Sequence, residues 1–226
     1  MSIAENLDRI KALLPPPVKL VAVSKTKPLE LILEAYHHGQ KAFGENKVQE
    51  LSGKYSDLPK DIEWHYIGHL QSNKIKYIAP FVHLIHGVDS FKLLKAIDAE
   101  AGKIGRIIPV LLQFHIAEED TKFGLSIEEA TEMLDSEAYR LLKNVQVSGV
   151  MGMATYTDDE NQVRKEFACL KSYFDSLKIT YFAHKPEFRE ISMGMSGDYI
   201  LAVDEGSTMV RIGSNIFGER NYLKNN

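Results

Sequence analysis

The chain contains a single cysteine, Cys169, among its 226 residues. One thiol cannot form a disulfide within the chain, so a disulfide scaffold is excluded and a reducing compartment is favoured. No apolar run approaches the about 20 residues that a membrane-spanning helix needs. Residues 1–14 carry charges throughout a helical pattern, unlike the charged-then-apolar order of a secretory signal. We therefore expect a cytoplasmic protein.

A strong charge of either sign is also lacking. The 27 Lys and Arg residues and the 31 Asp and Glu residues give a net charge of −4. This balance creates no field that would attract nucleic acid or an anionic membrane surface. Hydrophobic content of 44% and charged content of 26% are ordinary for a globular protein. We expect a soluble protein with a small-molecule ligand, no nucleic acid or membrane partner, and a monomeric or weakly dimeric state.

Strand-like and helix-like segments alternate along the whole chain, and this alternation predicts parallel strands joined by crossover helices. A leading helix covers residues 3–14. The helix-like stretches that follow are 28–39, 46–56, 71–79, 90–102, 126–141, 158–177 and 197–205. The strand-like segments are 19–25, 41–45, 63–68, 82–88, 107–115, 145–151, 189–194 and 208–212.

Eight strands with intervening helices predict an α/β protein with one domain over residues 1–226, a (β/α)8 TIM-like barrel with an additional N-terminal helix. The alternative is an open, doubly wound sheet. No Gly-x-Gly-x-x-Gly fingerprint follows the first strand, which favours the barrel. Segment 178–188 contains Pro186 and is longer than the usual connection, so we expect a surface excursion there.

Lys25 lies where a functional group of a parallel barrel is expected, at the carboxyl end of a strand. Val21, Val23 and Lys25 alternate with Ala22 and Ser24, so they share one face of the first strand. In a partly dry barrel mouth the neutral amine is favoured, and a neutral amine condenses with aldehydes. One alternative is that Lys25 is solvated in a loop, as most lysines are. Another is that Lys27, further into the loop, is the reactive amine. We favour Lys25.

A second constellation follows the last strand. Barrels often bind phosphate after strands seven and eight, where SMGMS (192–196) and IGSN (212–215) fall. Gly213 allows the backbone to approach a ligand closely, and backbone N–H groups at a short helix start can hold an anion. A short Gly-Ser turn is more often a simple change of chain direction than a phosphate site. Arg211 alternates with Val210 and Ile212, so it faces the interior if those two pack outward. There it needs a partner, for which Glu45 or Glu63 is a candidate.

Two histidine pairs are weak evidence for a metal site. His65 and His69 are four residues apart, and His83 and His86 are three apart. These segments are predicted strands, and we identify no cysteine or carboxylate that completes a ligand set. We predict no metal.

Six motifs together carry a family resemblance that spans residues 22 to 220. They are AVSKTKP, FGENKVQE, WHYIGHLQSNK, KFGL, SMGMSGDY and GSTMVRIGSNIFGER, in this order. The chain resembles the pyridoxal phosphate homeostasis proteins, the family related to the N-terminal barrel of alanine racemase. The resemblance implies that the cofactor is pyridoxal 5′-phosphate (PLP) and that Lys25 holds it as a Schiff base. It also implies that Arg211 contacts the pyridine nitrogen and that Asn46 lies near the ring.

The resemblance further implies that Ser192 and the backbone around Gly213 and Ser214 hold the phosphate, with Ser196 as a second candidate. Lys122, in the TKFGL segment, matches a lysine near the entrance that receives cofactor in transfer. PLP-dependent apoenzymes are the implied recipients of the cofactor.

An arginine beside the ring nitrogen disfavours its protonation, so the cofactor becomes a poor electron sink. We therefore expect a protein of PLP homeostasis that stores, buffers or delivers the cofactor and has no demonstrable catalytic activity. The alternative is a PLP-dependent amino-acid racemase of low activity, since alanine racemase also uses an arginine here. A racemase needs an acid/base group on each face, and alanine racemase takes the second from a further C-terminal domain. A third reading is a phosphosugar enzyme that forms a Schiff base with its substrate.

Overall fold

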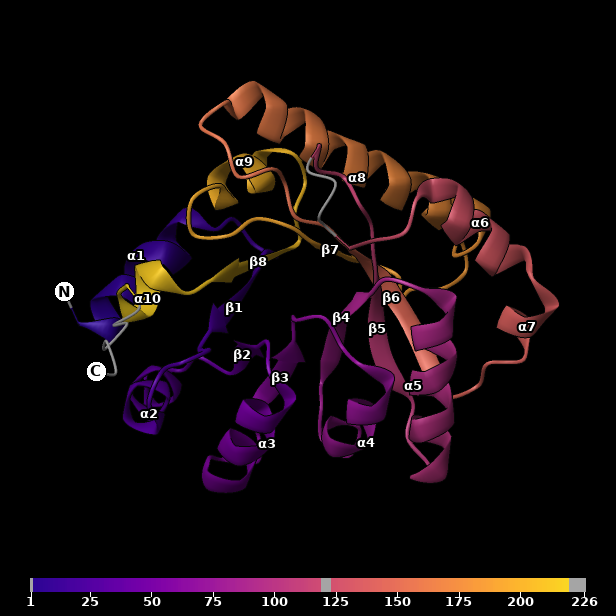
Figure 1. Ribbon diagram of the computed structural model, residues 1–226. Coiled ribbons are helices and arrows are strands. Elements are labelled where there is room, and N and C mark those ends of the chain that lie inside the picture. Colours follow the sequence, from indigo (N-terminus) through magenta and orange to yellow (C-terminus); the bar gives the residue numbers. More distant parts are fainter. Residues whose placement is uncertain (1, 119–122, 220–226) are drawn as a thin grey trace, which may run out of the picture.

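The computed structural model describes residues 2–118 and 123–219. Its eight strands close into one parallel barrel, in which each strand pairs with the next along the chain and β8 pairs with β1. Helices surround the strands (Figure 1). The predicted (β/α)8 barrel with an N-terminal helix is confirmed.

Each of the eight predicted strand segments contains one observed strand. The strands are β1 (Lys19–Val23), β2 (Ala42–Glu45), β3 (Glu63–Tyr66), β4 (Leu84–Val88), β5 (Ile108–Gln113), β6 (Val145–Met151), β7 (Glu190–Ser192) and β8 (Met209–Ile212). The helices are α1 (Ile3–Leu13), α2 (Leu29–His37), α3 (Val48–Asp57), the 3₁₀ turn η1 (Ser72–Lys74), α4 (Ile75–Ile78), α5 (Phe91–Lys103), α6 (Ile127–Asp135), α7 (Glu137–Arg140), α8 (Glu160–Thr180), α9 (Tyr199–Asp204) and α10 (Ser214–Phe217). Within the described ranges, no helix combines the length and the apolar composition that crossing a membrane requires.

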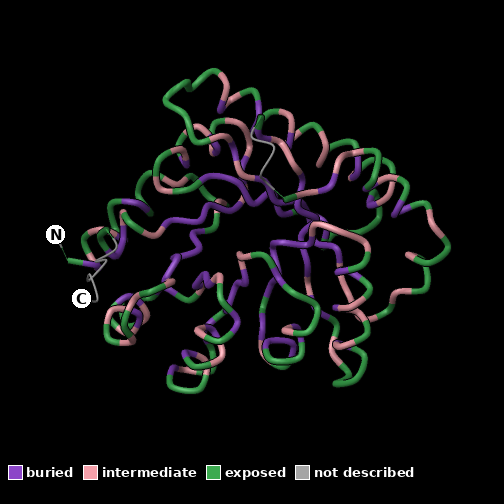
Figure 2. Tube along the Cα trace, viewed as in Figure 1, coloured by how far each residue is buried: buried purple, intermediate pink, exposed green. Residues whose placement is uncertain are grey.

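Side chains along the strands alternate between two environments, because successive residues of a strand point to opposite faces. Val210 and Ile212 belong to the large core between strands and helices, whereas Val21 and Met209 belong to a small cluster inside the barrel. The buried part of the trace follows the strands (Figure 2). The same alternation turns Arg211 inward, as the sequence predicts. The barrel interior therefore combines an apolar cluster with buried polar groups.

The N-terminal helix is capped at its start and packs against neighbouring helices. A capping box opens α1, in which Glu5 N donates to Ser2 Oγ at 3.2 Å and Ser2 N donates to Glu5 Oε2 at 2.8 Å. The buried face of α1 packs against α2 and α10, and Asn6 Nδ2 donates to the Ile216 carbonyl oxygen at 3.0 Å. The first and the last helix therefore lie side by side (Figure 1).

Two predicted helices are divided in the structure. Segment 126–141 splits into α6 and α7 at Ser136, whose hydroxyl accepts a hydrogen bond from Tyr139 N at 3.1 Å and caps the second helix. Segment 71–79 begins as η1 and continues as α4. The expected surface excursion at 178–188 is confirmed for residues 183–187, which are exposed and lie outside helices and strands. Its flanks differ, because α8 extends to Thr180 and the buried rings of Phe182 and Phe188 stack with centroids 4.2 Å apart.

The seam between β1 and β8 brings the two ends of the sequence together. Its register pairs Val21 with Arg211 and Ala22 with Ile212. Because parallel strands end at the same mouth of a barrel, Lys25 after β1 and Gly213 after β8 reach that mouth together. An added Cβ at Gly213 would lie 3.1 Å from the Val23 carbonyl oxygen, so the two chain segments are in close contact.

Candidate functional site

A cavity of about 870 Å³ lies at the carboxyl ends of the strands. Six of the seven predicted cofactor-binding residues line it: Lys25, Asn46, Ser196, Arg211, Gly213 and Ser214. Ser192 does not line it. Lys122 lies outside the described residues.

Lys25 lies in a turn that has an unusual backbone conformation. The residue is half-buried and lines the cavity. The next residue, Thr26, has a φ of 64°, which a β-branched residue rarely adopts and which costs on the order of 1–3 kcal/mol. Two hydrogen bonds hold this turn: Thr26 N donates to Glu50 Oε1 at 2.6 Å, and Lys27 N donates to the Ser24 carbonyl at 3.0 Å. The structure thus maintains a strained turn beside the predicted anchor.

A buried ion cluster of Lys54, Glu45 and Glu50 stabilises the same turn. Lys54 Nζ lies 2.8 Å from Glu45 Oε1, 2.6 Å from Glu50 Oε1 and 2.8 Å from the Ser24 carbonyl oxygen. The Ser24 hydroxyl donates to Glu45 Oε1 at 2.6 Å. Burial raises the pKa of Glu45, and the positive charge of Lys54 opposes that rise. Sequence reasoning missed Lys54, although its spacing of four residues from Glu50 on a helix was a signal.

Lys27 also lines the cavity, but its ammonium has other partners. Its Nζ lies 3.0 Å from the Phe217 carbonyl oxygen, 2.8 Å from that of Gly218 and 3.0 Å from that of Glu219. A cation that binds carbonyl groups at a helix C-terminus stabilises that end. Condensation with an aldehyde would remove this interaction, which argues against Lys27 as the reactive amine.

The glycine turn after β8 meets the loop after β7. Gly213 N donates to Ser196 Oγ at 3.3 Å, and Asn215 Nδ2 donates to the Ser196 carbonyl at 3.0 Å. Ser214 opens α10 directly after Gly213. Serine hydroxyls and backbone N–H groups are the donors that bind phosphate in proteins. This arrangement is able to hold an anion at the wall of the cavity.

Arg211 is anchored inside the barrel by neutral oxygens. Its Nη1 donates to the Ser192 carbonyl at 2.7 Å and to Ser192 Oγ at 2.6 Å, and its Nη2 donates to the Gly152 carbonyl at 3.1 Å. The expected carboxylate partners lie elsewhere: Glu45 binds Lys54, and Glu63 lines a cavity at the opposite mouth. Burial lowers the pKa of Arg211 to about 10, so the guanidinium stays charged at neutral pH.

Ser192 requires a correction of the predicted phosphate site. Its side chain is fully buried, and its hydroxyl lies between Arg211 and the Nδ1 of His86, which is 2.9 Å away. Strand β7 ends at Ser192 with its side chain inside the barrel, and the chain must turn before it reaches the cavity wall. Ser196 lies beyond that turn and lines the cavity. Of the two predicted serines, Ser196 lines the cavity and Ser192 does not.

Further residues of the cavity wall come from loops that sequence reasoning left unassigned. The rings of His69 and Phe123 stack with centroids 4.5 Å apart, and Gln113 Nε2 donates to the Phe123 carbonyl at 2.9 Å. Asn46 lies beside His69, because the Tyr66 hydroxyl donates to the Asn46 carbonyl at 3.2 Å and to the His69 carbonyl at 3.1 Å. The cavity therefore offers aromatic and amide surface as well as an amine and an anion cradle.

Solved structures share this architecture. PipY of Synechococcus elongatus PCC7942, solved with PLP bound, superimposes with a TM-score of 0.86 at 37% identity, over 96% of this chain and 100% of that chain. An alanine racemase of Clostridium difficile 630 superimposes with a TM-score of 0.76 at 15% identity, over 97% of this chain and 60% of that chain. At that identity the likeness to the racemase concerns the fold.

Curated relatives agree with the structural match. The pyridoxal phosphate homeostasis protein of Aquifex aeolicus (strain VF5) is 42% identical over 206 residues, 90% of this chain and 88% of the relative. The human protein of that name is 38% identical over 218 residues, 91% of this chain and 78% of the relative. The sequence profile of the alanine racemase N-terminal domain matches residues 1–221. Fold and site thus define a barrel of the alanine racemase N-terminal class. Within that class, the chain belongs to the pyridoxal phosphate homeostasis protein family.

Proposed function

We propose that this chain binds PLP at the carboxyl-terminal mouth of the barrel and takes part in intracellular PLP homeostasis. The observation that carries the proposal is the pairing, across one cavity, of the Lys25 amine with the Gly213 and Ser196 turn. The PLP-bound structure of the similar protein PipY supports the same ligand.

The residues of the cavity fit PLP in three respects. Lys25 would hold PLP through a C=N bond to its aldehyde carbon, with the aldehyde oxygen released as water. Ser196 and the backbone N–H groups at Ser214 hold the phosphate, and Asn46 lies beside the ring. A volume of about 870 Å³ is ample for one cofactor molecule.

Arg211 directs the site toward binding rather than catalysis. When bound, PLP stabilises negative charge at a substrate carbon most strongly if its ring nitrogen is protonated. A guanidinium that keeps its charge and donates to that nitrogen disfavours this protonation. We therefore propose a carrier without demonstrable catalytic activity, with PLP-dependent apoenzymes as recipients. The single Cys169 suits a reducing compartment, and we propose the cytoplasm as its location.

The anchor is tested by borohydride reduction of the PLP-loaded protein, followed by peptide mass spectrometry. We expect the reduced adduct on Lys25 alone. Lys27→Arg is the matched control, because arginine keeps a cation near the carbonyls of residues 217–219 and cannot form the adduct. Lys25→Arg abolishes the adduct and the visible absorbance, whereas Lys27→Arg retains both. An adduct on Lys27 in the wild type overturns the assignment.

A racemase of low activity is the competing function, and the related alanine racemase fold is its support. Incubation of the loaded protein with single L-amino acids, followed by chiral chromatography, separates the two. We expect D-enantiomer no faster than with free PLP across a broad panel. Turnover that exceeds free PLP and disappears in Lys25→Arg establishes the enzyme instead.

A further inference from the structure

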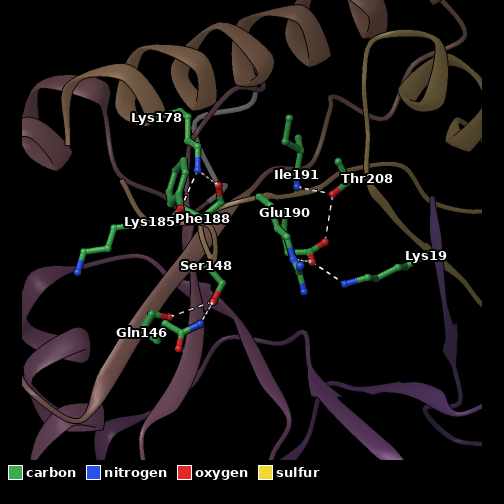
Figure 3. A network of polar contacts seen from close by, with 10 residues as sticks. Lys19, Gln146, Ser148, Lys178, Lys185, Phe188, Glu190, Ile191 and Thr208 are labelled. Atoms are coloured by element: carbon green, nitrogen blue, oxygen red, sulfur yellow. Dashed lines mark hydrogen bonds and ion pairs between the residues drawn. The ribbon is translucent and has the colours of Figure 1, made fainter. Parts of the chain in front are cut away.

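A second cavity, of about 950 Å³, lies at the opposite, amino-terminal mouth of the barrel. Its lining includes Glu63, His65, His83, Lys19 and Glu190. Figure 3 shows part of this region, where the side chains of Lys19 and Glu190 meet. This mouth is separated from the proposed PLP site by the barrel interior, so the proposed function does not account for it.

The strand register assembles three possible metal ligands in this cavity. Glu63 and His65 are two residues apart on β3, so their side chains share a face. His83 precedes β4, and its backbone N donates to the Trp64 carbonyl at 2.9 Å, which holds it beside β3. One ligand atom from each of Glu63, His65 and His83 lies within 4.8 Å of the others.

The ring of His65 is oriented as a metal ligand requires. His65 is 3% exposed, and its Nδ1 lies 2.9 Å from Nε2 of His86, which in turn contacts Ser192 through Nδ1 at 2.9 Å. Metal-binding histidines use their second ring nitrogen for a hydrogen bond, which holds the ring in place. The Nε2 of His65 is thereby assigned to the cavity side.

We propose that Glu63, His65 and His83 form a binding site for a divalent first-row transition-metal ion, with Zn²⁺ as the representative. Imidazole and carboxylate ligands suit such ions, and three protein ligands leave a coordination position open to water. The sequence expectation that no carboxylate completes a histidine ligand set is wrong, because Glu63 supplies one.

Charged side chains of both signs surround the three ligands. Lys19 lines the same cavity, and its Nζ lies 2.5 Å from Glu190 Oε1. Arg189 Nε lies 3.4 Å from the same carboxylate oxygen. Glu190 pairs with both cations, and the carboxylate of Glu63 adds a second negative charge directly at the site. A divalent ion therefore gains a charged ligand there.

Titration of the untagged protein, freed of metal by a chelator and dialysed, with Co²⁺ and with Zn²⁺ tests the proposal. We expect visible d–d absorbance from Co²⁺ that saturates at a single ion per chain and is displaced by Zn²⁺ but not by Mg²⁺ or Ca²⁺. His83→Ala and Glu63→Gln each weaken binding at least about tenfold. Both residues are exposed, so the variants preserve the core.

His184→Ala is the matched control, because His184 is equally exposed but lies on another segment. We expect it to bind Co²⁺ like the wild type. Equal binding by wild type and His83→Ala overturns the proposal, as does the absence of d–d absorbance. X-ray absorption of the Zn²⁺-loaded wild type gives an answer that depends on no variant: two imidazoles in the first shell support the site, and a shell without imidazole overturns it. PLP content is measured in parallel, so failure of the metal site leaves the proposed function intact.

Discussion

Arg211 Nη1 lies 2.6 Å from the hydroxyl oxygen of Ser192, inside the barrel and below the cavity. This contact separates two serines that look equivalent in the SMGMS motif. Ser192 holds the guanidinium, whereas Ser196 contacts the Gly213 turn. The two serines therefore have different predicted phenotypes.

Ser192→Ala removes a hydrogen-bond partner from both Arg211 and His86. We expect a loss of about 1–3 kcal/mol in the free energy of unfolding, because buried polar groups lose a partner. Ser196→Ala is expected to weaken PLP binding with little effect on stability. Urea unfolding and PLP titration distinguish them. If Ser192→Ala weakens PLP binding as Ser196→Ala does while stability stays unchanged, the assignment of Ser196 to the phosphate is wrong.

Lys54→Met leaves the fully buried carboxylate of Glu45 without its cationic partner. We expect destabilisation by about 3–5 kcal/mol, the usual consequence of breaking a buried ion pair from one side. The turn that carries Lys25 also loses its brace, so the PLP absorbance should develop more slowly. The double variant Lys54→Met with Glu45→Gln should regain part of the stability. Identical unfolding midpoints of the single and double variants would contradict an ion pair as the origin.

Gly213→Ala places a Cβ 3.1 Å from the Val23 carbonyl oxygen. The turn must shift away from β1, and overpacking of this kind costs about 1–3 kcal/mol. Since Gly213 belongs to the proposed phosphate cradle, we expect PLP affinity to fall by about tenfold or more. Gly53→Ala is the control, because nothing lies within 4 Å of its added Cβ. Wild-type affinity in Gly213→Ala, measured by fluorescence titration, argues against the cradle.

Stability should fall with acidification through the buried histidines. Burial lowers the pKa of His65 from 6.5 to about 3, and it lowers the pKa of His86 well below 6.5. Below about pH 6.5 the unfolded chain binds protons that the folded chain excludes, so stability present above this pH is lost as the pH falls. For His65 alone, the loss is on the order of 3 kcal/mol between about pH 7 and about pH 4.

Urea unfolding across this range, with a chelator present, measures the effect. His65→Asn should flatten the pH dependence, because asparagine does not titrate. The exposed His184→Ala should retain the wild-type slope. A slope that is the same in all three proteins would assign the pH dependence to other groups.

Much of the fold was predictable because short strand-like segments alternate with helical patterns along the chain. Strand ends were harder: residues 24 and 25 continue the alternation of β1 but belong to a turn. Lys25 was found because its parity matches Val21 and Val23. Ser192, which the family resemblance placed at the phosphate, ends β7 with its side chain buried beside Arg211.

Neither the buried ion cluster around Lys54 nor the group of Glu63, His65 and His83 was predicted, and the reason is physical. Contacts such as Glu45 with Lys54, or Glu63 with His83, depend on helix placement and on strand register. Neither is encoded in local periodicity. The spacing of Glu50 and Lys54 indicated a helical pair, but nothing in the sequence indicated that Lys54 would be 6% exposed.

In the proposed site the amine follows β1 and the phosphate turn follows β8, so retention of PLP there requires the closed barrel. During synthesis, the segment with Lys25 leaves the ribosome long before the segment with Gly213. A partly made chain thus has an amine but no turn to retain the phosphate, and its contact with an aldehyde is transient. Once the ring has closed, a ligand that bridges both segments opposes their separation and stabilises the fold in proportion to the logarithm of its concentration. Cofactor supply would then set how long each newly made barrel survives.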